Sequence, residues 1–259
     1  MGKYPELFTK QVKNYQEANV NWQEIAKKIL NALPNRYSLM LRARNNVVST
    51  YSQVYSKAVE NLRLDFTVFL VVYVGIGCGA GWATTYDNEP AVLLGLENIA
   101  EEKWHTKKKL AGLISHEIGH LAHMKWRNEW KDFEEAEEDP IFRLYSEGFA
   151  QRCEHLVLGA ETWHMAQGKG WVSWCIENER WLAGEFLRRI KSEDSVSDFF
   201  GSWFKIRGRS QTGYFLGHGL VRRMERTYGL RKMALLRIDE VKGLGISYLE
   251  SIVKHDLTD

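Results

Sequence analysis

Residues 113–123 read LISHEIGHLAH, and this stretch decides more about the fold than any other. Apolar side chains recur in and just before it at helical spacing: Leu110, Leu113, Ile114, Ile118 and Leu121. Such a stripe is typical of a helix that packs one face on a core, and we expect this helix to run from about Trp104 to about Asn128. Residues four apart lie on one side of a helix, so His116 and His120 can point at one common partner.

The residue types in this pattern indicate metal chemistry. Two imidazoles at positions i and i+4 can hold one Zn²⁺, and a glutamate directly after the first can accept a proton from water. With 8 His and 33 acidic residues in the chain, chance supplies at most roughly 0.03 such matches. We therefore predict that His116 and His120 bind zinc and that Glu117 is a general base. The competing interpretation is an ordinary solvated helix face without a metal.

A catalytic zinc ion usually has three protein ligands and one open position. A third histidine in the extended form of the motif would require Gly at 123 and His at 126, but the chain has His123 and Trp126. The alternative is a carboxylate from the next expected helix, 141–159. Glu147 is the candidate, because Gly148 beside it permits close packing against the HEIGH helix.

Three other residues are rivals for the third ligand. Glu154 lies two turns beyond Glu147 on the same face, and it can instead hydrogen-bond to a ligand histidine. His155 and His123 are expected to be packing or surface residues.

The sequence before the HEIGH helix predicts a small sheet. FTVFLVVYV (66–74), WATTY (82–86) and AVLLGLE (91–97) have the composition of strands. A glycine-rich loop separates the first two, and a turn at 87–90 separates the last two. The loop formally matches a dinucleotide-binding GxGxxA pattern, but strands rather than a helix are expected after it, so we reject that function.

The rest of the chain is expected to be helical. One helix begins near Trp22 and ends at Pro34, and a second one leads to Leu62. The predicted class is therefore α+β: a small, mostly antiparallel sheet packed on the HExxH helix, with helical N- and C-terminal parts. We expect an N-terminal helical segment over 1–64 and a main domain over 65–259.

Composition excludes some partners and compartments. The net charge of +2 offers no electrostatic case for nucleic acid, and no apolar run has the ~20 residues of a membrane span. Without a signal peptide the default expectation is a cytoplasmic protein. The three cysteines are odd in number and far apart, so we expect no disulfide. The oligomeric state is left open.

HEIGH followed by a Glu-bearing helix resembles the gluzincin class of zinc metallopeptidases. GWATTYDNEPAVLLGLE before it, YSEGFAQ after it and GYFLGHGLV (213–221) resemble more narrowly an uncharacterised family of predicted zinc-dependent proteases, over roughly residues 65–230. The resemblance implies a zincin-like fold and a peptide or protein substrate. It also implies that a sheet edge, WATTY or AVLLGLE, pairs with the extended substrate. The spacing from His120 to Glu147 is longer than the shortest in gluzincins.

Peptide hydrolysis also needs a donor that stabilises the tetrahedral oxyanion. Tyr214 and His218 are the candidates, because they are four residues apart on an expected helix; the alternative for both is a buried structural role. Two other functions remain open: a zinc-binding regulatory domain without turnover, and a metallohydrolase of a non-peptide amide. Glu117 argues against the first, because a purely structural site does not need a base.

Overall fold

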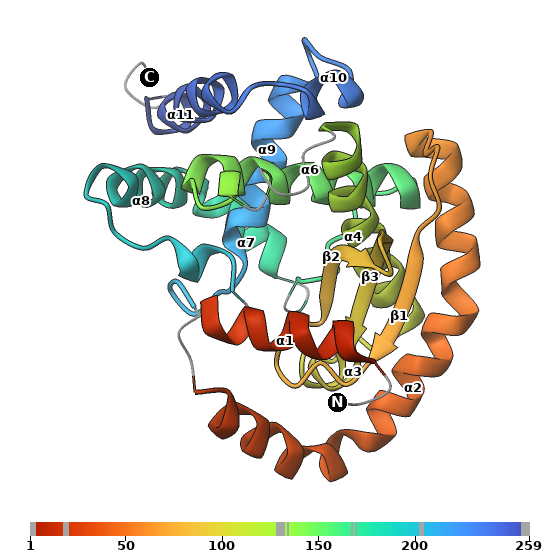
Figure 1. Cartoon of the computed structure of the whole chain (residues 1–259). Coiled ribbons are helices and arrows are strands. Elements are labelled where there is room, and N and C mark those ends of the chain that lie inside the picture. The colour runs from red at the N-terminus through yellow and green to blue at the C-terminus, as the bar shows by residue number, and fades with distance from the viewer. Residues whose placement is uncertain are drawn as a thin grey trace. The chain divides into compact units, whose positions relative to one another are not determined.

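The computed structural model describes residues 4–17, 21–127, 133, 135–166, 168, 170–201 and 205–254. The chain forms two compact units, one from Met1–Leu121 with Glu154–His164 and the other from Ala122–Cys153 with Met165–Asp259. Helices α4 (Lys107–Arg127) and α6 (Pro140–Leu158) each contribute to both. The described part of the chain is mostly helical with one small sheet (Figure 1), which confirms the α+β class.

The sheet belongs to the first unit and has the strand order β1-β3-β2. Its strands are β1 (Phe69–Tyr73), β2 (Gly81–Tyr86) and β3 (Glu89–Gly95). β2 and β3 form an antiparallel hairpin whose turn residues Asp87 and Asn88 both have positive φ. β1 pairs with β3 in parallel, because the chain reverses direction twice between them. The sheet is thus mixed, and the expectation of a mostly antiparallel sheet was wrong.

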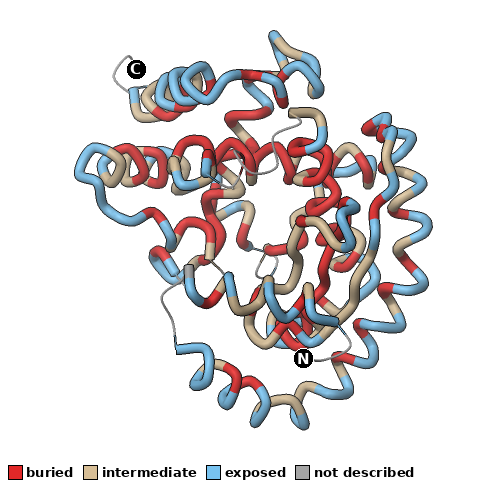
Figure 2. Tube along the Cα trace, in the orientation of Figure 1, coloured by how far each residue is buried: buried red, intermediate tan, exposed pale blue. Residues whose placement is uncertain are grey.

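The strand order also decides which strand can be an edge. β3 lies in the centre and is buried along all but its first residue (Figure 2), so AVLLGLE is not an edge. Its last two residues, Leu96 and Glu97, instead begin helix α3 (Leu96–Glu101). WATTY lies in β2, at an edge of the sheet.

Two predicted N-terminal helices are one helix, α2 (Trp22–Leu62), with Pro34 inside it. The prediction that Pro34 ends a helix was therefore wrong. A proline removes one N–H donor and crowds the preceding turn, which usually bends a helix, and Figure 1 shows α2 bending along its length. Tertiary packing maintains the helix beyond the proline: its later turns bury residues such as Val47 and Val54, and α3 packs against it.

Helix α1 (Pro5–Glu17) lies across one face of the sheet (Figure 1). Leu7 is buried in a cluster with Ala91 and Leu93 of β3. At the end of the sheet, the Gln11 amide donates to the carbonyl oxygen of Gly75 at 2.9 Å. The N-terminal helix is thus part of the core of the first unit.

The glycine-rich loop is held by a buried carboxylate. Glu97 is fully buried and accepts hydrogen bonds from the backbone N–H groups of Gly75 at 2.8 Å and Gly77 at 3.0 Å. β2, and not a helix, follows the loop. The glycines therefore make a strand connection, as expected when the dinucleotide function was rejected.

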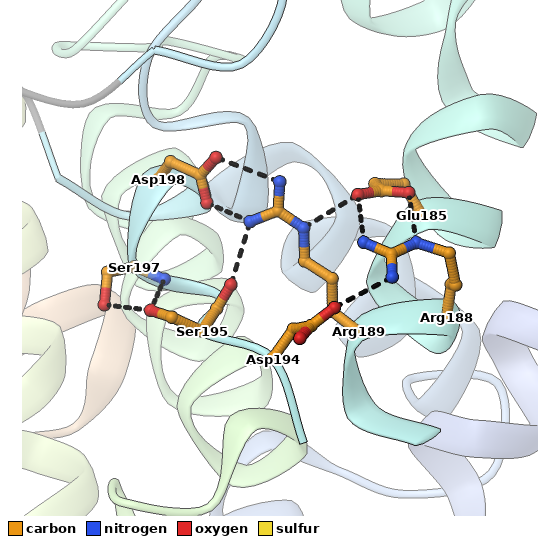
Figure 3. Close-up of polar contacts among 7 residues, drawn as sticks. All are labelled: Glu185, Arg188, Arg189, Asp194, Ser195, Ser197 and Asp198. Carbon is orange, nitrogen blue, oxygen red and sulfur yellow. Dashed lines mark hydrogen bonds and ion pairs between the residues drawn. The ribbon is translucent and has the colours of Figure 1, made fainter. Parts of the chain in front are cut away.

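The second unit consists of helices. They are the adjoining parts of α4 and α6, then α7 (Trp171–Glu177), α8 (Glu179–Lys191), the 3₁₀ turn η1 (Ser197–Phe199), α9 (Thr212–Met224), α10 (Leu230–Ala234) and α11 (Ile238–Lys254). α8 packs against α11. The C-terminal end of α8 is fixed by an ion-pair network (Figure 3), in which Arg189 donates to Glu185 at 2.8 Å and also pairs with Asp198.

Helices α6 and α9 approach so closely that only glycine fits where they meet. A Cβ atom on Gly148 would lie 2.1 Å from the carbonyl of Gly217, and one on Gly217 would lie 2.0 Å from the carbonyl oxygen of Leu144. Gly148 therefore allows the backbone of α9 to approach closely. The expectation that it serves close packing against the HEIGH helix is corrected accordingly.

All three cysteines are free and buried, which confirms the absence of a disulfide. Within the described ranges, the helices lack any stretch with the length and apolarity needed to cross a bilayer.

Candidate metal centre

The two motif histidines face each other from successive turns of α4. His116 is buried and His120 half-buried, and their Nε2 atoms are 3.2 Å apart. The ring centroids are 4.9 Å apart and the planes are tilted by 76°. The helix therefore brings two nitrogen ligands to one point, as the i, i+4 spacing predicts.

This separation fits a shared metal ion. Two nitrogens that each lie 2.0–2.1 Å from one tetrahedral zinc ion are about 3.3 Å apart, close to the observed 3.2 Å between the two Nε2 atoms. Neutral imidazoles are also among the ligands that zinc prefers. The chemistry and the spacing of the two donors thus agree with a zinc site.

Glu117 is buried beside the first histidine, and its carboxylate lies against the edge strand β2. A Cβ atom on Gly81, the first residue of β2, would be 2.5 Å from Glu117 Oε1 and 2.8 Å from Leu113 Cδ1. A side chain at position 81 would therefore displace the carboxylate. The predicted general base therefore lies next to the first residue of an edge strand.

A second acidic group, Glu154, lies close to His116. Glu154 is fully buried, and its Oε2 atom is 2.7 Å from His164 Nδ1. Glu154 Oε1 accepts hydrogen bonds from the Thr162 hydroxyl at 2.8 Å and from the backbone N–H of His164 at 3.2 Å. The rings of His116 and His164 are 5.0 Å apart.

Burial by itself would raise the pKa of the Glu154 carboxyl. The charge and hydrogen bond of His164, the charge of His116 and the Thr162 hydroxyl outweigh burial and hold this pKa below its usual value. These interactions therefore favour the ionised form of Glu154.

Sequence reasoning missed His164. It follows α6 in a short segment that starts after Gly159, whose positive φ ends the helix as predicted. The segment is held against α4: the Lys109 ammonium donates to the carbonyl oxygens of Trp163, at 3.2 Å, and of His164. His164 has no periodic spacing from the motif, so only tertiary structure brings it there.

Gly112 is the feature of the sequence that indicates the approach of another segment to α4. It lies one turn before His116, and a Cβ atom there would be 2.7 Å from His164 Cβ and 2.8 Å from Glu154 Oε1. A glycine inside a helix costs about 1 kcal/mol relative to alanine, so its presence one turn before a motif residue indicates a close approach by another segment.

The remaining predicted site residues lie in the second unit. Glu147 is half-buried on α6, Tyr214 is half-buried on α9, and His218 is buried one turn after it. The i, i+4 relation of Tyr214 and His218 on one helix is as expected. Their roles and that of Glu147 as third ligand stay predictions.

The two rival histidines have packing environments. His123 is fully buried and stacks on Phe149 with ring centroids 4.3 Å apart. His155 is buried, with Nε2 2.6 Å from the carbonyl oxygen of Thr162, and its ring lies edge-on to Trp163. Both agree with the expectation that they pack rather than bind metal.

Comparison of the chain with models of known protein families, with curated proteins and with solved structures found no match.

Proposed function

We propose that the protein is a zinc-dependent hydrolase of peptide bonds, with the metal bound by His116 and His120 and with Glu117 as general base. The observation that carries the proposal is the pair of Nε2 atoms 3.2 Å apart on α4, with a buried carboxylate on the adjacent residue. A purely structural zinc site usually has four protein ligands and no use for such a base.

When bound, zinc would polarise the substrate carbonyl and lower the pKa of a water molecule. Glu117 would accept the proton of the attacking water and deliver it to the leaving nitrogen. Its burial between α4 and Gly81 restricts the carboxylate to few positions, which favours proton transfer along one defined direction.

The edge strand supports a peptide as substrate. β2 is at the edge of the sheet and its first residue contacts Glu117. An extended peptide that added to this edge would be held by main-chain hydrogen bonds, and its backbone would pass close to the base. This agrees with the zincin-like arrangement that the gluzincin resemblance implies.

Glu147 is the proposed third ligand. Glu147 and Glu154 are seven residues, or about two turns, apart on the continuous helix α6, so they project from the same face. Glu154 is engaged by His164 and Thr162, which leaves Glu147 as the carboxylate proposed for the metal. Tyr214 and His218 are the proposed donors to the oxyanion.

The test combines zinc content with turnover of a fluorogenic peptide library. We expect His116→Ala to lose zinc, and Glu117→Gln to keep zinc but lose about 10²–10⁴-fold in rate, the usual contribution of a general base. His105→Ala is the matched control, because His105 precedes α4 and takes no part in the pair. Loss of zinc in Glu117→Gln would show that Glu117 has a different role.

Turnover also separates the two alternative functions. A regulatory zinc-binding domain would bind zinc but cleave no peptide with or without a chelator. A hydrolase of another amide would leave peptides intact and cleave small amide substrates in a chelator-sensitive reaction.

A further inference from the structure

Glu154 and His164 form a hydrogen-bonded pair beside the proposed zinc ligands His116 and His120. Both side chains and that of His116 are almost completely buried, with exposed fractions of 0%, 4% and 2%. One potential ligand atom from each lies within 4.8 Å of the others. Three such groups could either hold a metal themselves or support a metal ligand.

The distances favour the second possibility, in which Glu154 and His164 support a metal ligand and do not bind the metal themselves. Glu154 Oε2 and His164 Nδ1 are 2.7 Å apart, a hydrogen-bond distance that is shorter than the roughly 3.3 Å between two ligands of one tetrahedral zinc ion. Glu154 Oε1 already accepts two further hydrogen bonds. The Nε2 atom of His116 faces His120.

We propose that Glu154 and His164 form a positioning pair that fixes the ring of His116, so that its Nε2 atom points toward His120. This inference rests on the proposed zinc site. A histidine that binds metal through one ring nitrogen is commonly oriented by a carboxylate near the other, which fixes the tautomer and raises the basicity of the ligand. Here the carboxylate acts through His164: Glu154 holds the His164 ring at 2.7 Å, and that ring lies edge-on to the ring of His116, with centroids 5.0 Å apart and planes inclined at 64°.

The surrounding residues keep the pair in place. Gly112 leaves the space that the Glu154 carboxylate and the His164 side chain occupy against α4. Lys109 binds the backbone of residues 163 and 164, and the ring of Trp104 lies edge-on to His164 at 5.1 Å. The pair is therefore a rigid support, because its partners on α4 belong to the same helix as His116.

The experiment compares Glu154→Gln and His164→Asn with the control His155→Asn, using the full chain. His155 is adjacent to Glu154 on α6, is equally buried and binds the same segment through Thr162. Zinc affinity is measured by competition with a chromophoric chelator at neutral pH. We expect it to fall about 10–100-fold in Glu154→Gln and in His164→Asn, and to stay near the wild-type value in His155→Asn.

A second readout does not depend on zinc. The tautomer of His116 in the metal-free protein is measured from the ¹⁵N shifts of its ring, and thermal unfolding reports whether each variant folds. We expect Glu154→Gln to change the ring shifts of His116, and His155→Asn to leave them unchanged. Unchanged shifts in a folded Glu154→Gln variant would overturn the proposal.

Two further outcomes would also decide against it. Equal zinc affinities in Glu154→Gln and His155→Asn would reduce the pair to ordinary packing. Zinc lost in His164→Asn but kept in His120→Ala would place the ion among His116, Glu154 and His164. If instead the wild-type protein binds no zinc while the His116 shifts respond to Glu154→Gln, the zinc hydrolase proposal fails and the orientation of His116 by Glu154 stands.

Discussion

The crossing of α6 and α9 provides a stability test that is independent of any assumed activity. Gly148 and Gly217 meet there, and the atoms that a new Cβ would strike belong to the backbone. In Gly217→Ala the Cβ would lie 2.0 Å from the carbonyl oxygen of Leu144 and 3.0 Å from the backbone N of Gly148. No rotation of a side chain can relieve such a clash, so the two helices must move apart.

The size of the effect follows from two opposing terms. Overpacking of a well-packed contact usually costs about 1–3 kcal/mol, and a rigid backbone neighbour places this case at or above the upper end. Replacing a helical glycine with alanine stabilises the helix by about 1 kcal/mol. We therefore expect Gly217→Ala to lower the free energy of unfolding by at least about 2 kcal/mol. At roughly 2–4 °C per kcal/mol for a chain of this size, Tm should fall by at least about 4 °C.

Gly243 is the matched control, because it is exposed inside helix α11 and a Cβ there would meet nothing within 4 Å. Gly243→Ala should raise the free energy of unfolding by up to about 1 kcal/mol. Thermal unfolding followed by circular dichroism compares both variants with wild type. A Gly217→Ala variant as stable as Gly243→Ala would refute the close approach of α6 and α9.

Three further predictions concern the site and the ion pairs. Gly81→Ala should push the Glu117 carboxylate by about 1 Å and reduce peptide turnover by about 10²-fold; unchanged zinc content and kcat/KM would contradict the contact with β2. Gly112→Ala should weaken zinc binding with little loss of helix content, because its Cβ would displace Glu154; a chelator titration measures this. Hydrogen bonds from two arginines lower the pKa of Glu185 to about 2. Its stabilising contribution is therefore present above its ordinary pKa and is lost as pH falls through that value toward 2. Glu185→Gln should cost on the order of 1 kcal/mol at neutral pH, and urea unfolding should show this difference vanishing in acid; a difference that persists at acidic pH would contradict the assignment.

Local sequence patterns predicted the elements around the site well. The apolar stripe through Leu113 and Ile118 predicted α4, and the structure begins it within a few residues of the expected start. The turn residues Asp87 and Asn88 predicted the β2–β3 hairpin. These features depend on neighbours in the sequence, so their physical causes are visible in a short window.

The features that were mispredicted depend on distant contacts. Pro34 disfavours a helix locally, but burial of later turns of α2 maintains the helix. The parallel pairing of β1 with β3 depends on which edge of the β2–β3 hairpin the first strand joins, and this contact is between strands that are not adjacent in the sequence. Tertiary packing therefore outweighs the local preference at Pro34 and selects the pairing of β1.

The candidate site combines both kinds of information. The spacing of His116 and His120 brings two nitrogens together on one helix, and this part is readable from five consecutive residues. The positions of Glu117 and Glu154 depend instead on missing side chains: Gly81 leaves room for one carboxylate, and Gly112 leaves room for the other. A glycine in a helix or strand carries an energetic cost, so a glycine beside a reactive motif is itself a signal of a close neighbour. Gly112 is such a glycine, and the segment that approaches it is the one that carries His164.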